Sequence, residues 1–372
     1  MRDAGIVVYA GKGSSHSWTW LADLFESENV LNVRFLDSPG FISSIKESPP
    51  RKALISGGDG FTIAQALKGK GFAALERWIN DGGSYIGICA GAYLPLPSSI
   101  PPFSEFNLSA TRIENISCDA SLAGRGPREA VPYGSCSIVH PIRGPVRLNG
   151  KSGTSVTAPL YGGPIFGEPA RDEAVMRYDA LTPQTEVQIG RSEAESMIIG
   201  RPAIIRAMHG KGKLLLFGPH LEHPGFPEAN TRFLDLLNLK RAGRTEGSRE
   251  NGRLADPNLL SSISDLKVAV LGLENRSFTV GHKAWDGGRL LELLSAIEKR
   301  VQTLSEGGSE RIHSHLRRAR DLLVMMKVGN DSDADEVTTL MVEAARYCVD
   351  RHFATKREAS RKQAGLARAI AG

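Results

Sequence analysis

One cysteine of this chain stands at a junction between strand and turn that is typical of a reactive thiol. Cys89 follows the apolar run Gly83–Ile86 and lies between Gly87 and Gly91. Small residues at these two positions let the chain turn sharply beside the thiol, as in a nucleophile elbow. A helix that begins after Cys89 would direct its N–H groups at the sulfur and favour the thiolate. The pattern predicts a nucleophile; the plainer alternative is a buried core cysteine at a Gly-rich turn.

A histidine and a carboxylate that could serve this thiol lie far downstream. The apolar run Lys213–Phe217 predicts a central strand, and His220 and Glu222 follow it closely. In an extended chain, residues two apart point the same way, so the two side chains can share one side. A carboxylate fixes the tautomer of a catalytic histidine and stabilises its charged form. His223 is the second candidate base, and a surface cluster in a Pro-bounded loop is the alternative without chemistry.

Four segments together carry a family resemblance. They are Gly57–Gly60, Gly87–Tyr93, Tyr161–Phe166 and Gly218–Glu222. In this order the sequence resembles class I glutamine amidotransferase-like proteins. More narrowly, residues 1–240 are similar to the N-terminal domain of eukaryotic biotin-protein ligases and its free-standing microbial relatives.

The resemblance implies a fold and a catalytic set. The fold is a flavodoxin-like parallel sheet covered by helices on both faces. The implied triad is Cys89, His220 and Glu222, with the backbone N–H groups of Gly58 and Ala90 as the oxyanion hole. The implied activity is that of a thiol-dependent hydrolase or amidotransferase acting on C–N bonds.

The resemblance also implies a set of substrate-binding residues: Asp59, Tyr93, Tyr161, Gly162 and Gly163. Members that use glutamine carry Gln at the fourth position after the nucleophile, where this chain has Tyr93. We therefore expect a small-molecule or peptide amide as substrate and poor use of free glutamine. The glycines of the 161–163 loop permit close backbone approach to a ligand, although an ordinary tight turn is an equal alternative.

The ligase module that accompanies this domain in biotin-protein ligases has no counterpart in the sequence. The chain lacks a Gly-Arg-Gly-Arg-type adenylate loop, and about 130 residues follow residue 240, too few for a ligase core and its cap. We therefore expect a protein that does not attach biotin.

Composition narrows the class of protein. The chain has 372 residues, 41% of them hydrophobic, and a net charge of +5. These values predict about two globular domains and give no indication of nucleic acid as a partner. No apolar run is long enough for a membrane span, and a strand begins almost at once where a signal peptide would lie. The 4 cysteines lack regular spacing, which predicts reduced thiols, a cytoplasmic location and no metal site. We expect no cofactor.

The elements that must position these residues alternate in the first half of the chain. Apolar runs predict strands at Gly5–Tyr9, Asn32–Leu36, Lys52–Ser56 and Ser84–Ile88, and helices at Ser17–Glu26, Gly60–Leu67 and Phe72–Asn80. Such alternation predicts a parallel sheet whose strands end at one shared edge. That edge would bring the Gly57–Gly60 loop and Cys89 together. The loop Gly11–Ser15 would lie beside them, and it lacks the spacing of a phosphate loop.

Residues 106–208 lose this alternation and gain Pro, Gly and β-branched residues. We expect an antiparallel insertion with strands at Ser109–Ser117, Ser137–His140, Ser155–Pro159, Ala174–Tyr178 and Ala203–Ala207. A closing helix is expected at Asn230–Leu239.

The remainder of the chain predicts a second domain. Residues 241–260 are expected to form a linker, because Arg241–Arg253 is polar and charged. Residues 261–372 are expected to form a helical domain with a basic tail at Lys356–Arg368. Apolar stripes predict helices at Leu290–Ile297, Ile312–Met326 and Val337–Cys348, the last capped within residues 331–333.

Two functions from different classes fit the sequence. The first is a thiol enzyme that cleaves an amide-type bond. The second is a catalytically silent binding or regulatory module that acts through residues 261–372, by self-association or with a protein partner. Retention of Cys89, His220 and Glu222 favours the first, and Tyr93 favours the second or a substrate other than glutamine.

Overall fold

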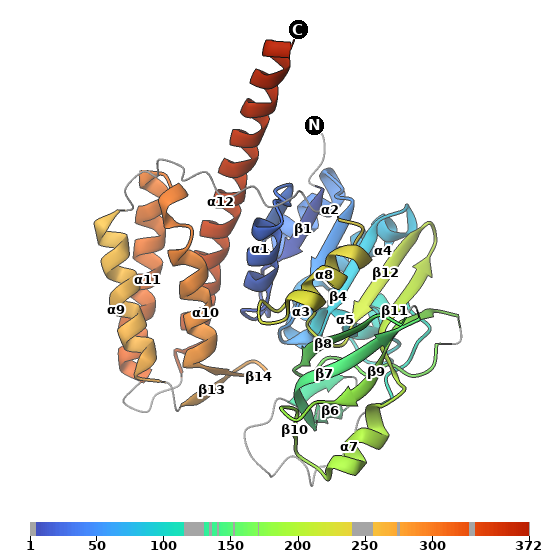
Figure 1. The fold of residues 1–372 in the computed structure, drawn as a ribbon. Coiled ribbons are helices and arrows are strands. Elements are labelled where there is room, and N and C mark those ends of the chain that lie inside the picture. Colours follow the sequence, from blue (N-terminus) through green and yellow to red (C-terminus); the bar gives the residue numbers. More distant parts are fainter. Residues whose placement is uncertain are drawn as a thin grey trace.

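The structure is a computed structural model of the 372-residue chain. It describes residues 5–114, 130–133, 136–139, 141–151, 153–169, 171–239, 256–273, 276–326 and 332–371. Figure 1 shows a sheet region with its covering helices beside a bundle of long helices. Within the described ranges, no helix is long and apolar enough to cross a membrane.

Five parallel strands form the centre of the first region: β1 (Ile6–Tyr9), β2 (Val33–Leu36), β3 (Lys52–Ile55), β4 (Ser84–Ile88) and β12 (Gly212–Phe217). Their order is β2-β1-β3-β4-β12, and each neighbouring pair is parallel. This is the strand order of flavodoxin-like folds. The predicted α/β fold and all four predicted N-terminal strands are confirmed.

Helices connect these strands. They are α1 (Trp18–Ser27), α2 (Ser38–Glu47), α3 (Gly60–Leu67), α4 (Lys70–Asn80) and α5 (Ala90–Tyr93). The sequence predicted α1, α3 and α4 but not α2, which begins with Ser38-Pro39-Gly40 and so looks like a loop. The Asp37 side chain caps α2 by accepting the Gly40 N–H, and Pro39 fits the first turn because its missing N–H is not needed there.

Antiparallel strands extend the sheet beyond β12. They are β7 (Ile142–Gly150), β8 (Ser155–Leu160), β9 (Glu173–Leu181), β10 (Glu186–Val187) and β11 (Pro202–His209), with helix α7 (Arg191–Ile198) between the last two. A separate hairpin pairs β5 (Ala130–Tyr133) with β6 (Cys136–Val139). The 3₁₀ helix η1 (Phe103–Phe106) precedes this part of the chain.

The predicted strand over Ser109–Ser117 is wrong for residues 109–114, which are not a strand, and residues 115–117 lie outside the described ranges. Asp172 accepts hydrogen bonds from the Ser109 and Thr111 hydroxyls and from the Thr111 N–H. Side-chain bonds of this kind compete with strand pairing for the backbone and hold the segment as a loop.

Helix α8 (Pro227–Leu236) closes the first region, and α9 (Pro257–Leu271), α10 (Gly287–Glu298), α11 (Glu306–Met326) and α12 (Ala334–Ala371) form the bundle. A hairpin of β13 (Ser277–Val280) and β14 (Lys283–Asp286) precedes α10, and the 3₁₀ helix η2 (Val301–Thr303) follows it. The three predicted apolar stripes lie on α10, α11 and α12, whereas α9 and the hairpin were not predicted. Helix α9 begins inside the range 241–260 that was predicted as a linker, and the domain boundaries stay predictions.

The bundle packs directly on the sheet region. Helix α12 runs along strand β2, and the rings of Phe35 and Phe353 lie 5.2 Å apart. The Phe35 N–H donates to Asp350 Oδ1 at 2.9 Å, and one apolar cluster runs from the sheet into the bundle. The long helix therefore covers the β2 edge of the sheet, which would otherwise expose unpaired backbone groups.

Candidate active site

Cys89 occupies a strained backbone position at the end of β4. Its φ of 51° and ψ of −109° lie in a region that residues with a side chain rarely adopt. Its N–H donates to the carbonyl of Phe217 at 2.9 Å, and helix α5 begins at the next residue. Strain of this kind persists where surrounding structure over-determines it, and it concentrates at functional sites.

The two flanking glycines are required by packing. A Cβ atom on Gly87 would lie 2.4 Å from the carbonyl oxygen of Gly91, and one on Gly91 would lie 2.0 Å from that of Ile55. Both distances are far below van der Waals contact, so neither position accepts a side chain. The short turn predicted from the sequence is therefore present, and it holds the thiol at the carboxyl edge of the parallel strands.

His220 and Glu222 meet as the sequence predicted. His220 Nδ1 lies 2.7 Å from Glu222 Oε1, and the two residues are 3% and 0% exposed. The His220 side chain is also hydrogen-bonded to that of Cys89. Ser56, at the end of β3, donates to Glu222 Oε1 at 3.2 Å. The imidazole thus bridges a thiol and a carboxylate in a site that excludes most water.

The charges around His220 favour its protonated form. Burial alone would lower the pKa of His220, but the negative charges of Glu222 and Cys89 and the hydrogen bonds that the imidazole donates to both raise it well above its usual value. An imidazolium between a thiolate and a carboxylate is the arrangement that activates cysteine nucleophiles.

His223, the second candidate base, has a different environment. Its Nδ1 accepts the Gly225 N–H at 3.0 Å, and its ring packs against Trp20 at a centroid distance of 4.5 Å. Burial and the neighbouring charge of His220 lower the pKa of His223. Of the two histidines, His220 is therefore the one joined to both Cys89 and Glu222.

The two N–H groups predicted for an oxyanion hole are free within the described residues. Gly58 pairs with Ser14 in a bridge whose hydrogen bonds run from Asp59 N–H to Gly13 and from Ser15 N–H to Gly57. These bonds bypass the Gly58 N–H. Ala90 is the first residue of α5, where an N–H has no acceptor within the helix.

The predicted substrate-binding residues make contacts inside the protein. Tyr93 is 1% exposed, and its hydroxyl donates to the carbonyl of Gly162 at 3.0 Å. Gly162 has a φ of 106°, and Gly163 packs so tightly that a Cβ would lie 1.8 Å from the carbonyl oxygen of Gly218. Tyr161 places its ring 5.9 Å from that of His220. The 161–163 loop is therefore tied to both the elbow and the histidine strand.

Asp59 is also fully engaged. Its Oδ1 accepts the N–H groups of Phe61 and Thr62 and so caps α3, and its Oδ2 accepts from the Thr62 hydroxyl and from His282. A substrate contact for Asp59, as for the 161–163 loop, stays a prediction.

Sequence reasoning missed two residues at this site. Ser56 directly precedes the Gly57–Gly60 segment, so its position at a strand end was a usable signal. Tyr178 on β9 gave no such signal in the sequence, because it reaches the Cys89 site only through antiparallel pairing of strands that are far apart in the chain. Its hydroxyl is buried, has no hydrogen-bond partner among the described residues, and lies 2.5 Å from where a Cβ on Gly218 would be. Burial and the charge of Cys89 both raise the pKa of Tyr178.

Comparison with known proteins identifies the first region. Residues 5–99 match the family described as "Biotin-protein ligase, N terminal". Residues 5–99 are therefore similar to the N-terminal domain of biotin-protein ligases. This match includes the Gly57–Gly60 segment and the Cys89 elbow, and it confirms the resemblance seen in the sequence.

Other similarities are more distant. An uncharacterized protein of Chlamydia muridarum (strain MoPn / Nigg) is 27% identical over 230 residues, which are 59% of this chain and 80% of that protein. A crystal structure of a glutamine amidotransferase aligns at 14% identity and a TM-score of 0.41, covering 63% of this chain and all of that one. A β-galactosidase from Bacillus circulans sp. alkalophilus aligns at 10% identity and a TM-score of 0.38, covering 64% of this chain and 31% of that one.

Proposed function

We propose that this protein is a thiol-dependent amidase or amidotransferase that acts on an amide-type C–N bond. The observation that carries the proposal is the buried bridge of His220 between Cys89 and Glu222 at a strained strand-to-helix turn. A core cysteine requires neither the strained backbone nor a histidine bound to a carboxylate.

The reaction follows from the roles of these residues. The Cys89 thiolate attacks the amide carbonyl, and the Gly58 and Ala90 N–H groups hold the oxygen that becomes negative. His220 gives its proton to the leaving nitrogen as the C–N bond breaks, which leaves a thioester on Cys89. Water, activated by His220, then attacks the thioester and releases the acid. The nitrogen leaves as ammonia or an amine, or passes to an acceptor.

The substrate class follows from Tyr93. Tyr93 has no side-chain amide of the kind that glutamine-using relatives carry at this position, and its hydroxyl is already bonded to the Gly162 carbonyl. We propose an amide on a small molecule or peptide other than free glutamine.

The test is Cys89-dependent release of ammonia or amine from a panel of primary and secondary amides that includes glutamine. Cys89→Ala should abolish release from the preferred amide. Cys348→Ala, which changes a buried thiol in the bundle, should leave it intact. Turnover by glutamine at least equal to that of every other amide would contradict the substrate proposal, and turnover that survives Cys89→Ala would contradict the mechanism.

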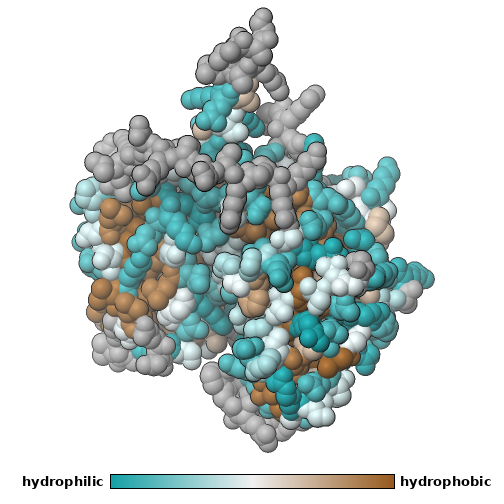
Figure 2. Space-filling view, in the orientation of Figure 1, coloured by the Kyte–Doolittle hydropathy of each residue, from teal (hydrophilic) through white to brown (hydrophobic). Residues whose placement is uncertain are grey.

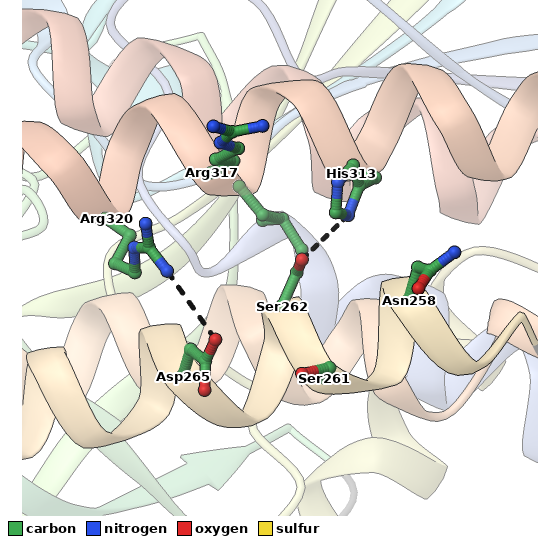
Figure 3. Close-up of a pocket in the computed structure, with 8 residues that line it drawn as sticks. Asn258, Ser261, Ser262, Asp265, His313, Arg317 and Arg320 are labelled. Carbon is green, nitrogen blue, oxygen red and sulfur yellow. Dashed lines mark hydrogen bonds and ion pairs between the residues drawn. The ribbon is translucent and has the colours of Figure 1, made fainter.

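The alternative is a binding module that acts through the bundle. Five large apolar side chains on α9 and α11 are exposed: Leu260 (42%), Val268 (67%), Leu271 (47%), Val324 (51%) and Met325 (58%). Figure 2 shows brown apolar surface over these helices. A polar groove of about 340 Å³ lies between α9 and α11. Figure 3 shows the residues that line it, with Ser262 hydrogen-bonded to His313 and Asp265 paired with Arg320. Absence of any Cys89-dependent turnover, with self-association that Val268→Asp disrupts, would favour this second function.

A further inference from the structure

We propose that the β13–β14 hairpin holds the oxyanion loop in place, and that His282 at its tip is the positioning residue. This inference rests on the proposed function, because it concerns the Gly58 N–H group. It assigns a role in the reaction to a segment more than 200 residues away from Gly58 in the sequence.

The hairpin tip sits directly on Asp59. The His282 backbone N–H donates to Asp59 Oδ2 at 2.8 Å, and the His282 ring Nδ1 lies 3.2 Å from the same oxygen. Gly281 has a φ of 61°, and a Cβ there would lie 2.5 Å from Asp59 Oδ2. The ring of His282 also packs edge-on against Phe61 at 5.2 Å. The hairpin tip therefore packs closely against the Asp59 carboxylate.

The position of Asp59 affects the backbone of its neighbour Gly58. The Asp59 N–H donates to the Gly13 carbonyl at 2.8 Å, and its Oδ1 caps α3 through Phe61 and Thr62. Burial would raise the pKa of Asp59, but hydrogen bonds from His282 and Thr62 lower it, so the carboxylate stays charged. The Gly58 N–H lies in the peptide unit just before the one that Gly58 shares with Asp59, so a shift of Asp59 that changes the backbone angles of Gly58 also changes the direction of this N–H.

Open space lies on one side of this contact. A cavity of about 360 Å³ lies beside the contact, lined by the Gly11–Ser14 loop, Asp59, Gly281 and the start of α12. The His282 side chain is 48% exposed, so it contributes little to the core. The contact with Asp59 is therefore what distinguishes His282 from an ordinary hairpin residue, and its loss should alter the loop more than the stability of the fold.

Two reactions of the same thiol separate the oxyanion hole from the nucleophile. Alkylation by iodoacetamide displaces iodide and forms no oxyanion, whereas acylation by p-nitrophenyl acetate passes through a tetrahedral oxyanion. Loss of one good oxyanion donor costs roughly 100-fold or more in rate. His282→Ala removes the ring bond to Asp59 Oδ2 and keeps the backbone bond. The donor that it misdirects should reduce Cys89 acylation about 10-fold and leave alkylation unchanged.

Three further variants sharpen the test. Gly281→Ala, which forces a methyl group against Asp59, should reduce acylation at least as much as His282→Ala. His282→Asn keeps a donor and should recover part of the rate. Thr279→Ala changes an exposed residue on the same hairpin and should have no effect.

Each outcome decides the question. Wild-type acylation rates in both His282→Ala and Gly281→Ala would overturn this inference and leave the proposed function standing. An equal fall in alkylation and acylation would also overturn it, because the hairpin would then act on the thiol or the whole fold. If the wild-type protein is alkylated but never acylated at Cys89, both the inference and the proposed function fail.

Discussion

Two histidine–carboxylate pairs in this protein, each with a buried histidine, look alike and differ in their surroundings. His220 is bonded to Glu222 at 2.7 Å in the sheet region, and His352 of α12 is bonded to Glu26 of α1 at 2.6 Å. His220 also contacts Cys89, the proposed nucleophile, which lies in a strained turn. His352 also lies 3.2 Å from the Thr303 hydroxyl, which offers no such chemistry.

The neighbouring cations give the second pair its role. Glu26 is paired with Arg300 at 2.8 Å and with Lys356 at 3.1 Å as well as with His352. Arg300 is 1% exposed and is also bonded to Asp23. This network joins α1 to the bundle. A histidine–carboxylate pair of this kind therefore indicates chemistry only when its third partner is reactive.

The largest expected difference is in reactivity. His220→Ala removes the proposed general acid and base, so Cys89 acylation by p-nitrophenyl acetate should fall by about 100-fold to 10,000-fold. His352→Ala should leave the rate within about twofold, because no reacting group touches it. Stopped-flow acylation of both variants checks this, and a similar loss in the two would remove the distinction between the pairs.

The second prediction concerns stability. Glu26→Gln leaves the buried Arg300 with Asp23 as its remaining acidic partner, so the free energy of unfolding should fall by about 2 kcal/mol. Cys89 alkylation should not change in the folded protein. Urea unfolding gives the measurement, and Glu193→Gln, at an exposed position on α7, is the matched control. No loss relative to that control would mean that the network does not hold the two regions together.

The two pairs should respond to opposite ends of the pH scale. Burial raises the pKa of Glu26, but the His352 hydrogen bond and the charges of Arg300, His352 and Lys356 outweigh it and lower the folded value. Its stabilisation is thus present above about pH 4.3 and lost as the pH falls below that. The raised pKa of His220 has the opposite effect on the pH dependence of folding. The stabilisation that the charged His220 gives to the folded state is present below about pH 6.5 and is lost as the pH rises.

Urea midpoints measured across the pH range check these signs. Glu26→Gln should flatten the acid side of the profile, and Glu222→Gln should flatten the alkaline side. If either substitution flattens the opposite side, the charge assignments above are wrong.

The smallest expected effect is at Ser56. Its hydroxyl donates to Glu222 Oε1, so Ser56→Ala should loosen the carboxylate and slow acylation by about 3-fold to 10-fold, a cost of about 1 kcal/mol. Ser196→Ala on α7 serves as the control. A loss as large as that of His220→Ala would show that Ser56 contacts the reacting groups rather than supporting Glu222.

The sequence predicts the elements with local signals. The Cys89 turn, the His220–Glu222 spacing and the β1–β4 alternation can each be read within a few residues, and parallel strands then bring them to one edge. Helix α2 was missed because Ser38-Pro39-Gly40 resembles a loop until the Asp37 cap is seen.

Contacts between distant segments could not be predicted in this way. No local pattern connects His282 with Asp59, or Tyr178 with Cys89. The apolar stripes of α10 and α12 predict burial, yet they do not say what covers them. The structure packs both stripes within the chain, with α12 against the β2 edge. Association of residues 261–372 with a partner therefore stays a prediction that depends on the exposed face of α9 and α11.

The most direct test of the account is to map which cysteine reacts. The folded protein is exposed briefly to p-nitrophenyl acetate, digested and analysed by mass spectrometry. We predict the acetyl group on Cys89, none on Cys348, and loss of labelling in His220→Ala but not in His352→Ala. Equal labelling of all four cysteines, or labelling of Cys89 that does not depend on His220, would contradict the claim that these residues form a catalytic site.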